Sequence, residues 1–322
     1  MTEFELIQRY FAAQCAPRAD VALGVGDDAA VLRPPPGEEL AVTTDTLIEG
    51  RHFPREAAPG DVGWKALAVN LSDLAAMGAQ PRWFVLALTL EPSRAHDAWL
   101  AAFAEGLARL AREAGVALVG GDTTRGALSV TITALGTVPP GAALRRSGAQ
   151  VGDAVCVTGT LGDAALALQM LQTPSQMHDA QTGEYLFERL NRPSPRLAAG
   201  LALRDLANAA IDLSDGLAGD LKHILEASGV GAEIEIDTLP MSAAFARLHD
   251  PAQRLRLQAC GGDDYELCLC IPPDRLAQAR ARVEALPLTV IGRIRDEPGL
   301  VWRDACGKPL NLDLHGYRHF GD

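Results

Sequence analysis

Residues 65–79 read KALAVNLSDLAAMGA, and this stretch sets one acid, Asp73, inside an otherwise apolar helical pattern. Leucines recur around Asp73 at helical spacing, which predicts a helix over residues 61–77, with Asp61 as its N-cap and Gly78 just past its last turn. The small and apolar residues that follow Asp73 leave little polar surface on this helix. A carboxylate in such surroundings needs a hydrogen-bond partner or a metal ion.

Five further acidic clusters lie outward from this helix, each directly after a glycine or a β-like run. They read GVGDD (24–28), TTDT (43–46), GGDT (120–123), IDLSDG (211–216) and GGDD (261–264). Carboxylates that follow glycine turns and strand ends can converge on one point, where they repel one another unless cations lie between them. Oxygen ligands of this kind suit Mg²⁺, which usually accompanies substrate phosphates. The sequence therefore predicts a magnesium-dependent enzyme that acts on phosphates.

Composition excludes several other classes of protein. The chain has 322 residues, 48% of them hydrophobic, and a formal net charge of −12. The negative charge argues against a general nucleic-acid surface and against an anionic-membrane surface. No apolar run reaches the length of a membrane helix, and MTEFELIQRYF (1–11) carries acids where a signal peptide carries bases. We therefore expect a cytoplasmic protein that meets neither nucleic acid nor membrane.

Strand and helix patterns alternate along the chain, which indicates an α/β (α+β) protein of two similar-sized lobes. A loop rich in Gly, Pro and Arg follows residue 138. It predicts an N-terminal mixed-sheet domain over residues 1–138, a linker over 139–153 and a C-terminal α/β domain over 154–322. WFVLALTL (83–90) is apolar on both faces and is typical of a fully buried strand, and a helix is expected over residues 196–208.

Each acidic motif also has a structural interpretation when it is taken alone. Asp45 follows a β-like run, where ligand sites gather in α/β proteins, but it could equally cap a helix. Asp122 follows a predicted strand and two glycines, where backbone amides can hold a phosphate. Ser214 lies where a helix is expected to begin, which favours an anion there or an ordinary cap. His52 alone is more typical of a structural histidine, whereas six acidic sites together are hard to explain as caps.

The motifs, taken in order, resemble the thiamine-monophosphate kinase family over nearly the whole chain. GVGDDAAV, TTDTLIEGRHF, KALAVNLSDLAAMGA, GGDTTRG, RSGAQVGD, VTGTLGD, IDLSDGL and GGDDYELC match its blocks in their order. The resemblance implies the two-domain fold shared with aminoimidazole ribonucleotide synthetase and selenophosphate synthetase. It also implies a homodimer formed through the N-terminal sheet, and phosphorylation of thiamine monophosphate to thiamine diphosphate with ATP and several Mg²⁺ ions.

The resemblance carries site roles onto this chain residue by residue. The implied metal ligands are Asp28, Thr43, Thr44, Asp45, Asp73, Asp122, Asp212 and Asp215. The implied ATP contacts are Gly121, Asp122, Arg146 and Ser214. The implied substrate contacts are His52, Asp263 and Tyr317, and the family often has Glu at the position of Asp263.

The expected chemistry is direct phosphoryl transfer without a catalytic base or a covalent intermediate. The acceptor is a phosphate oxygen, which is already a nucleophile at neutral pH, so the difficulty lies in bringing polyanions together. Two alternatives stay open at this point: another ATP-dependent enzyme of the same superfamily, and a non-catalytic dimer that binds divalent cations. The chain lacks a P-loop and the kinase-type HRD and DFG motifs, so carboxylates, metals and backbone amides would have to build the site.

Overall fold

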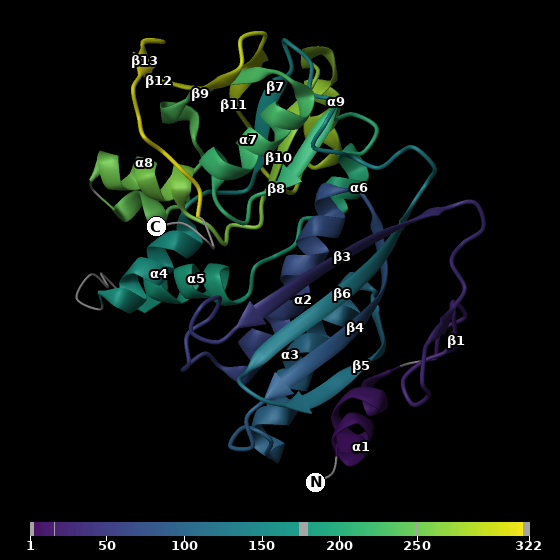
Figure 1. Cartoon of the computed structure of the whole chain (residues 1–322). Coiled ribbons are helices and arrows are strands. Elements are labelled where there is room, and N and C mark those ends of the chain that lie inside the picture. Colours follow the sequence, from purple (N-terminus) through teal and green to yellow (C-terminus); the bar gives the residue numbers. More distant parts are fainter. Residues whose placement is uncertain (1–2, 16, 174–179, 249, 318–322) are drawn as a thin grey trace. The chain divides into compact units, whose positions relative to one another are not determined.

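The computed structural model describes residues 3–15, 17–173, 180–248 and 250–317 (Figure 1). The chain forms two compact units, one of Met1–Leu74 with Ala79–Gly141, the other of Ala75–Gly78 with Ala142–Asp322. The chain passes from the first unit to the second at residues 141–142. Ala75–Gly78, at the end of the first long helix, also belongs to the second unit. The domain limits expected from the sequence stay a prediction. Among the described residues, no helix combines the length and the apolar character needed to cross a membrane.

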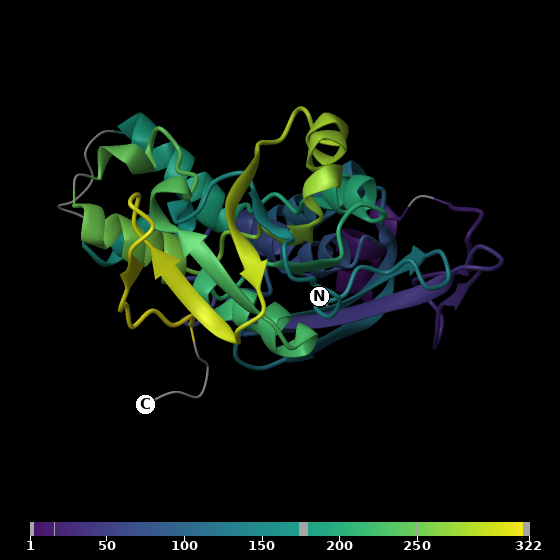
Figure 2. The same cartoon turned by 90° about the horizontal axis from the view of Figure 1, so that it is seen from above.

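The first unit is built on a mixed four-stranded sheet in the order β3-β6-β4-β5, in which only β4 and β5 run parallel. Two 18-residue helices, α2 and α3, cover one face of this sheet, as both views show (Figures 1 and 2). Its elements are α1 (Glu3–Leu6), β1 (Val21–Leu23), β2 (Val31–Leu32), β3 (Glu39–Ile48), α2 (Pro59–Ala76), β4 (Gln80–Leu90), α3 (Asp97–Ala114), β5 (Ala117–Arg125) and β6 (Ser129–Val138).

The opposite face of this sheet is left open. Along β3 the side chains alternate, so that Leu47 is 4% exposed on the helix side, while Leu40, Val42 and Ile48 on the other side are 51%, 60% and 46% exposed. Threonines line the same open face on β6, where Thr131 and Thr133 pair with Thr46 and Thr44. The first unit therefore leaves an apolar and threonine-rich sheet face uncovered within one copy of the chain.

The second unit is a seven-stranded mixed sheet in the order β13-β12-β9-β11-β7-β10-β8, with helices on both faces. Its strands are β7 (Ala154–Thr158), β8 (Ala209–Asp212), β9 (Gly231–Glu235), β10 (Leu267–Ile271), β11 (Leu288–Arg295), β12 (Gly299–Arg303) and β13 (Pro309–Leu310). Its helices are α4 (Asp163–Gln172), α5 (Ala180–Asn191), α6 (Leu197–Leu203), α7 (Leu217–Ser228), α8 (Pro251–Cys260) and α9 (Leu276–Arg282).

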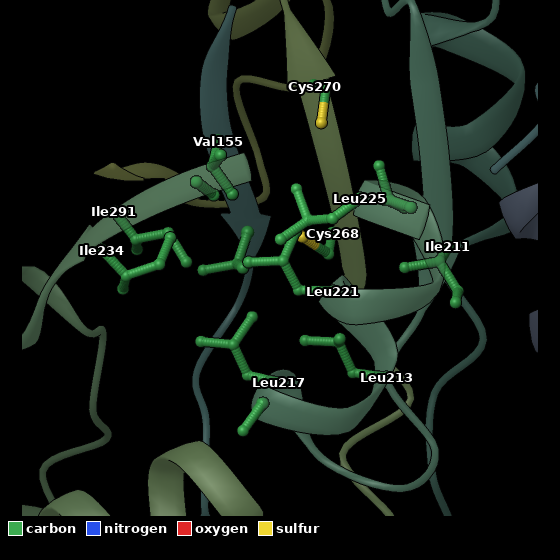
Figure 3. Packing of buried hydrophobic residues seen from close by; sticks show 14 of the residues in the cluster. Val155, Ile211, Leu213, Leu217, Leu221, Leu225, Ile234, Cys268, Cys270 and Ile291 are labelled. Carbon is green, nitrogen blue, oxygen red and sulfur yellow. The ribbon is translucent and has the colours of Figure 1, made fainter. Parts of the chain in front are cut away.

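The core of the second unit forms where α7 packs on the sheet. Leu217, Leu221 and Leu225 recur every fourth residue on α7 and meet the strand side chains, including Cys268 and Cys270 on β10 (Figure 3). The two cysteines alternate along the strand and therefore share a face. This packing fixes the start of α7 and the end of β8, between which residues 213–216 form a tight loop.

Several local predictions needed correction. Asp61 is not the N-cap of its helix, because α2 already begins at Pro59 and Asp61 lies within the first turn. The strand over 83–90 is not buried on both faces, since Ala87 is exposed on the open side of the sheet. The helix expected over 196–208 is only Leu197–Leu203. Gly78 does follow the helix in a left-handed conformation with φ of 62°, as predicted.

Candidate functional site

Two candidate ligands of the first unit, Asp45 and Asp122, do not lie at strand ends, although the sequence had predicted that they would. Asp45 lies within β3, which continues to Ile48, and Asp122 lies within β5, which continues to Arg125. Both strands are longer than predicted because threonines, which favour extended backbone, follow each acid. Strand alternation, rather than strand termination, therefore decides which way each acid faces.

One pair of candidate ligands meets on the helix face of the sheet. The hydroxyl of Thr43 on β3 donates a hydrogen bond to the Asp73 carboxylate on α2. Asp45 lies two residues beyond Thr43 on β3 and so shares its face. The hydrogen bond from Thr43 explains how a carboxylate is accommodated in the apolar α2, because Asp73 is half-buried and meets a polar side chain of β3.

Thr44 and Asp122 lie on the other, open face. The Thr44 hydroxyl donates to the carbonyl of Ile132 at 3.1 Å, and Asp122 pairs across the sheet with Ala87, whose side chain is exposed on that face. Within one copy of the first unit, the side chains of these two candidate ligands therefore face away from Asp73. The sequence alone had placed all of them in one metal cluster.

A large open cavity adjoins this part of the first unit. Its volume is about 1310 Å³, and it brings together Asp28 and the turn before it with Gly121 and Asp122 of β5. Gly121 has φ of 151°, and a Cβ there would lie 1.9 Å from the carbonyl oxygen of Leu86, so only glycine fits. The lining thus includes backbone at a glycine together with the carboxylates of Asp28 and Asp122, a combination that suits a phosphate accompanied by a cation.

His52 lies in the loop after β3, where its ring is held by the main chain. The backbone N–H of Ile48 donates to Nδ1 of His52 at 2.9 Å, so that the proton of the neutral ring lies on Nε2. The carbonyl of His52 in turn accepts from the buried Lys65 at 3.3 Å. The ring is therefore oriented by its surroundings, which is consistent with a contact role and equally with a structural one.

The candidate residues of the second unit come together at the end of β8. Asp212 ends that strand, and Ser214 and Asp215 follow in the loop before α7. The backbone N–H of Asp263 donates to the carbonyl of Ser214 at 2.9 Å, and the N–H of Tyr317 donates to the carbonyl of Asp215 at 2.9 Å. Three segments that lie far apart in the sequence are thus joined by main-chain hydrogen bonds, as the motif order had not revealed.

Arg146 lies in the second unit, outside these loops. It is exposed, in the loop before β7, and its carbonyl accepts from Ser228 at 3.2 Å. Its role in binding ATP stays a prediction.

Asp220 is a residue of this site that sequence reasoning missed. Its Oδ2 accepts from the backbone N–H of Asp215 at 3.0 Å and from that of Gly216 at 3.1 Å, which fixes the loop that carries Asp215. Burial, followed by the nearby charge of Asp212, raises the pKa of Asp220 to about 8. The available signal was its spacing: Asp220 lies one helical turn after Gly216, where a side chain can cap the start of α7.

Among the described residues, no three His, Cys, Asp or Glu side chains gather closely enough to hold a metal ion. The donors that do meet, the Thr43 hydroxyl and the Asp73 carboxylate, are oxygens, which fit Mg²⁺ and not a softer metal. Mg²⁺ usually keeps several waters and takes only one or two carboxylates with substrate phosphates, so this pair is an adequate protein contribution.

Residues 26–138 match the model of the AIR synthase related protein, N-terminal domain, and residues 150–304 match that of the AIR synthase related protein, C-terminal domain. The thiamine-monophosphate kinase of Escherichia coli (strain K12) is 50% identical over 322 residues, which cover 99% of this chain and 98% of that protein.

Two solved structures resemble the chain over most of its length. The thiamine-monophosphate kinase from Stenotrophomonas maltophilia K279a matches with a TM-score of 0.87 and 47% identity, covering 96% of this chain and 98% of that one. A structure described as AaThiL complexed with AMPPCP and TMP matches with a TM-score of 0.77 and 30% identity, covering 91% of each chain. Two matched domains and half-identical sequence over the full length place this chain in the thiamine-monophosphate kinase family, within the AIR synthase related proteins.

Proposed function

We propose that this protein transfers the γ-phosphoryl group of ATP to the phosphate of thiamine monophosphate, giving thiamine diphosphate and ADP. The observation that carries the proposal is the 50% identity to the Escherichia coli thiamine-monophosphate kinase over 99% of this chain. The similarity to a structure complexed with AMPPCP and TMP supports the same pair of substrates, since AMPPCP is ATP with a methylene in place of one bridging oxygen. Because ATP is its co-substrate, we place the reaction in the cytoplasm.

The residues of the chain suit direct, in-line transfer. The attacking phosphate oxygen needs no base, so the protein's task is to position two polyanions and offset their repulsion. In the first unit, Thr43, Asp45 and Asp73 would hold magnesium on the helix face, while Asp28, Thr44, Gly121 and Asp122 border the cavity or the open face. Bound magnesium would neutralise the phosphate charges and align donor and acceptor.

In the second unit, the loop after β8 would hold polyphosphate and metal through Ser214, Asp212 and Asp215. The loop precedes the N-terminus of the 12-residue α7, whose backbone amides favour anions. Arg146 would add positive charge for ATP, and His52, Asp263 and Tyr317 would contact the thiamine portion. These individual roles follow from the motif resemblance.

The direct test uses the whole protein with ATP, MgCl₂ and thiamine monophosphate. We expect thiamine diphosphate and ADP to form in equal amounts, followed by ³¹P NMR. ADP formation without thiamine diphosphate, or no reaction in the presence of Mg²⁺, would refute the proposed function.

Asp73→Asn should lower turnover by about 10²-fold or more, since one charged group that stabilises the transferring phosphate is lost. The amide oxygen still accepts from Thr43, so the melting temperature without metal should hold. Asp274→Asn, at an exposed position of the second unit, is the matched control and should leave turnover unchanged. Turnover of Asp73→Asn near that of the control at saturating Mg²⁺ would remove Asp73 from the site.

Tyr317→Ala should raise KM for thiamine monophosphate and leave KM for ATP nearly unchanged. Tyr317 is 46% exposed, so its ring is available to stack on the cationic thiazolium ring, a contact worth about 0.5–2 kcal/mol. A tenfold rise corresponds to about 1.4 kcal/mol. Tyr317→Phe, which keeps the ring, should be mild. A lower melting temperature with both KM values unchanged would make Tyr317 purely structural.

We further propose that the protein is a homodimer whose subunits meet through the open sheet face of the first unit. Leu40, Val42 and Ile48 give this face an exposed apolar strip, and two-fold pairing is the commonest way to cover one. The candidate ligands Thr44 and Asp122 lie on the same face, so a second copy would close that side of the metal site.

Light scattering should give twice the chain mass of 34.1 kDa at micromolar concentration. Val42→Asp puts a charge into the open face and should give the monomer mass, because a desolvated, unpaired carboxylate is costly in an interface. Val151→Asp is the matched control, as Val151 is 58% exposed in the second unit, and it should stay dimeric. A wild-type protein of monomer mass would contradict the proposal.

A further inference from the structure

The GGDDY loop (residues 261–265) carries two residues in a strained backbone conformation. Asp263 has φ of 67° and Tyr265 has φ of 49°, and no other non-glycine residue among those described has a positive φ. Left-handed backbone is unfavourable for any residue that has a Cβ, and especially for a bulky residue such as tyrosine. Strain of this kind persists only where neighbouring groups determine the conformation, and it gathers at functional sites.

Main-chain hydrogen bonds hold both strained residues against the loop after β8. The N–H of Asp263 donates to the carbonyl of Ser214 at 2.9 Å, and the N–H of Tyr265 donates to the carbonyl of Leu213 at 2.8 Å. The loop is therefore fixed by the same segment that carries the candidate metal ligand Asp215.

Buried side chains hold the loop from its other side. Both oxygens of the Asp264 carboxyl accept from the backbone N–H of Gly162 at 3.0 Å. Glu266 is fully buried and accepts from Thr158 at 2.7 Å, from Arg189 at 2.9 Å and from Arg196 at 2.7 Å. The main chain on either side of Tyr265 is thus anchored, and the tyrosine cannot shift without breaking these contacts.

The side chain of Tyr265 ends on the Asp263 carboxylate. Tyr265 is 8% exposed, and its hydroxyl donates to Oδ1 of Asp263 at 3.1 Å. Asp263 itself is only half-buried. A rigid, buried donor therefore fixes the direction of a carboxylate that still reaches solvent.

We propose that Tyr265 is a positioning residue, whose hydroxyl orients the Asp263 carboxylate toward thiamine monophosphate. The inference rests on the proposed function and on the substrate contact assigned to Asp263. Removing the hydroxyl takes away the hydrogen bond that holds Oδ1 of Asp263, and the lost orientation must then be made up when the substrate binds. The strained backbone brings the hydroxyl of Tyr265 and the carboxylate of Asp263 together, although the two residues are only two positions apart.

The test compares Tyr265→Phe with the wild type. This variant keeps the ring and removes only the hydroxyl, so KM for thiamine monophosphate should rise about tenfold, as for a hydrogen bond to a charged group. KM for ATP and kcat should stay within about twofold, because the phosphate and metal contacts are untouched. Tyr185→Phe is the matched control: its hydroxyl also donates to an aspartate, Asp163, at 3.3 Å in the same unit, and its loss should change neither KM.

A double-mutant cycle separates positioning from a general loss of packing. In an Asp263→Ala background no carboxylate remains to be oriented, so adding Tyr265→Phe should change KM for thiamine monophosphate by less than about twofold. The inference is overturned if Tyr265→Phe leaves that KM unchanged, if it raises both KM values together with a lower melting temperature, or if it acts equally in the Asp263→Ala background. A wild type that makes no thiamine diphosphate would instead refute the proposed function, which separates the two failures.

Discussion

The strained backbone of the GGDDY loop depends on the buried charges beneath it. Each left-handed non-glycine residue costs about 1–2 kcal/mol, so Asp263 and Tyr265 together oppose folding appreciably. Glu266 offsets this backbone strain by pairing with two arginines in the interior. Asp264, which lies between the two strained residues, is anchored by the hydrogen bond that its carboxyl accepts from Gly162. Removing one partner of such a buried pair is strongly destabilising, because the other charge is left alone.

A cluster of buried ionisable side chains holds the GGDDY loop. Three buried carboxyls, those of Asp163, Asp264 and Glu266, face two guanidinium groups, those of Arg189 and Arg196. Burial raises the pKa of Asp264 well above its usual range, which favours the neutral form of this carboxyl. Hydrogen bonds join these buried groups to one another and to the loop, so the cluster supports the loop as a rigid block.

The sequence predicted the architecture well where helical periodicity was strong, as in α2, and where glycine ended a helix, as at Gly78. It placed Asp45 and Asp122 at strand ends, whereas both lie inside longer strands, and alternation puts their side chains on opposite faces of the sheet. It also missed the structural roles of Asp220 and Tyr265, and those of the buried carboxyls of Asp264 and Glu266. Their roles come from non-local contacts, such as Asp264 with Gly162, that no local pattern encodes.

Amide hydrogen exchange of the wild-type protein tests the rigidity of the GGDDY loop most directly. The backbone N–H groups of Asp263 and Tyr265 donate to the carbonyls of Ser214 and Leu213, so we predict that they exchange as slowly as those of β10 (Leu267–Ile271), a strand paired on both sides. Exchange at these two amides as fast as at Gly37, in an exposed turn of the first unit, would show that the loop opens freely. That result would contradict a preformed, strained loop as the support of the site.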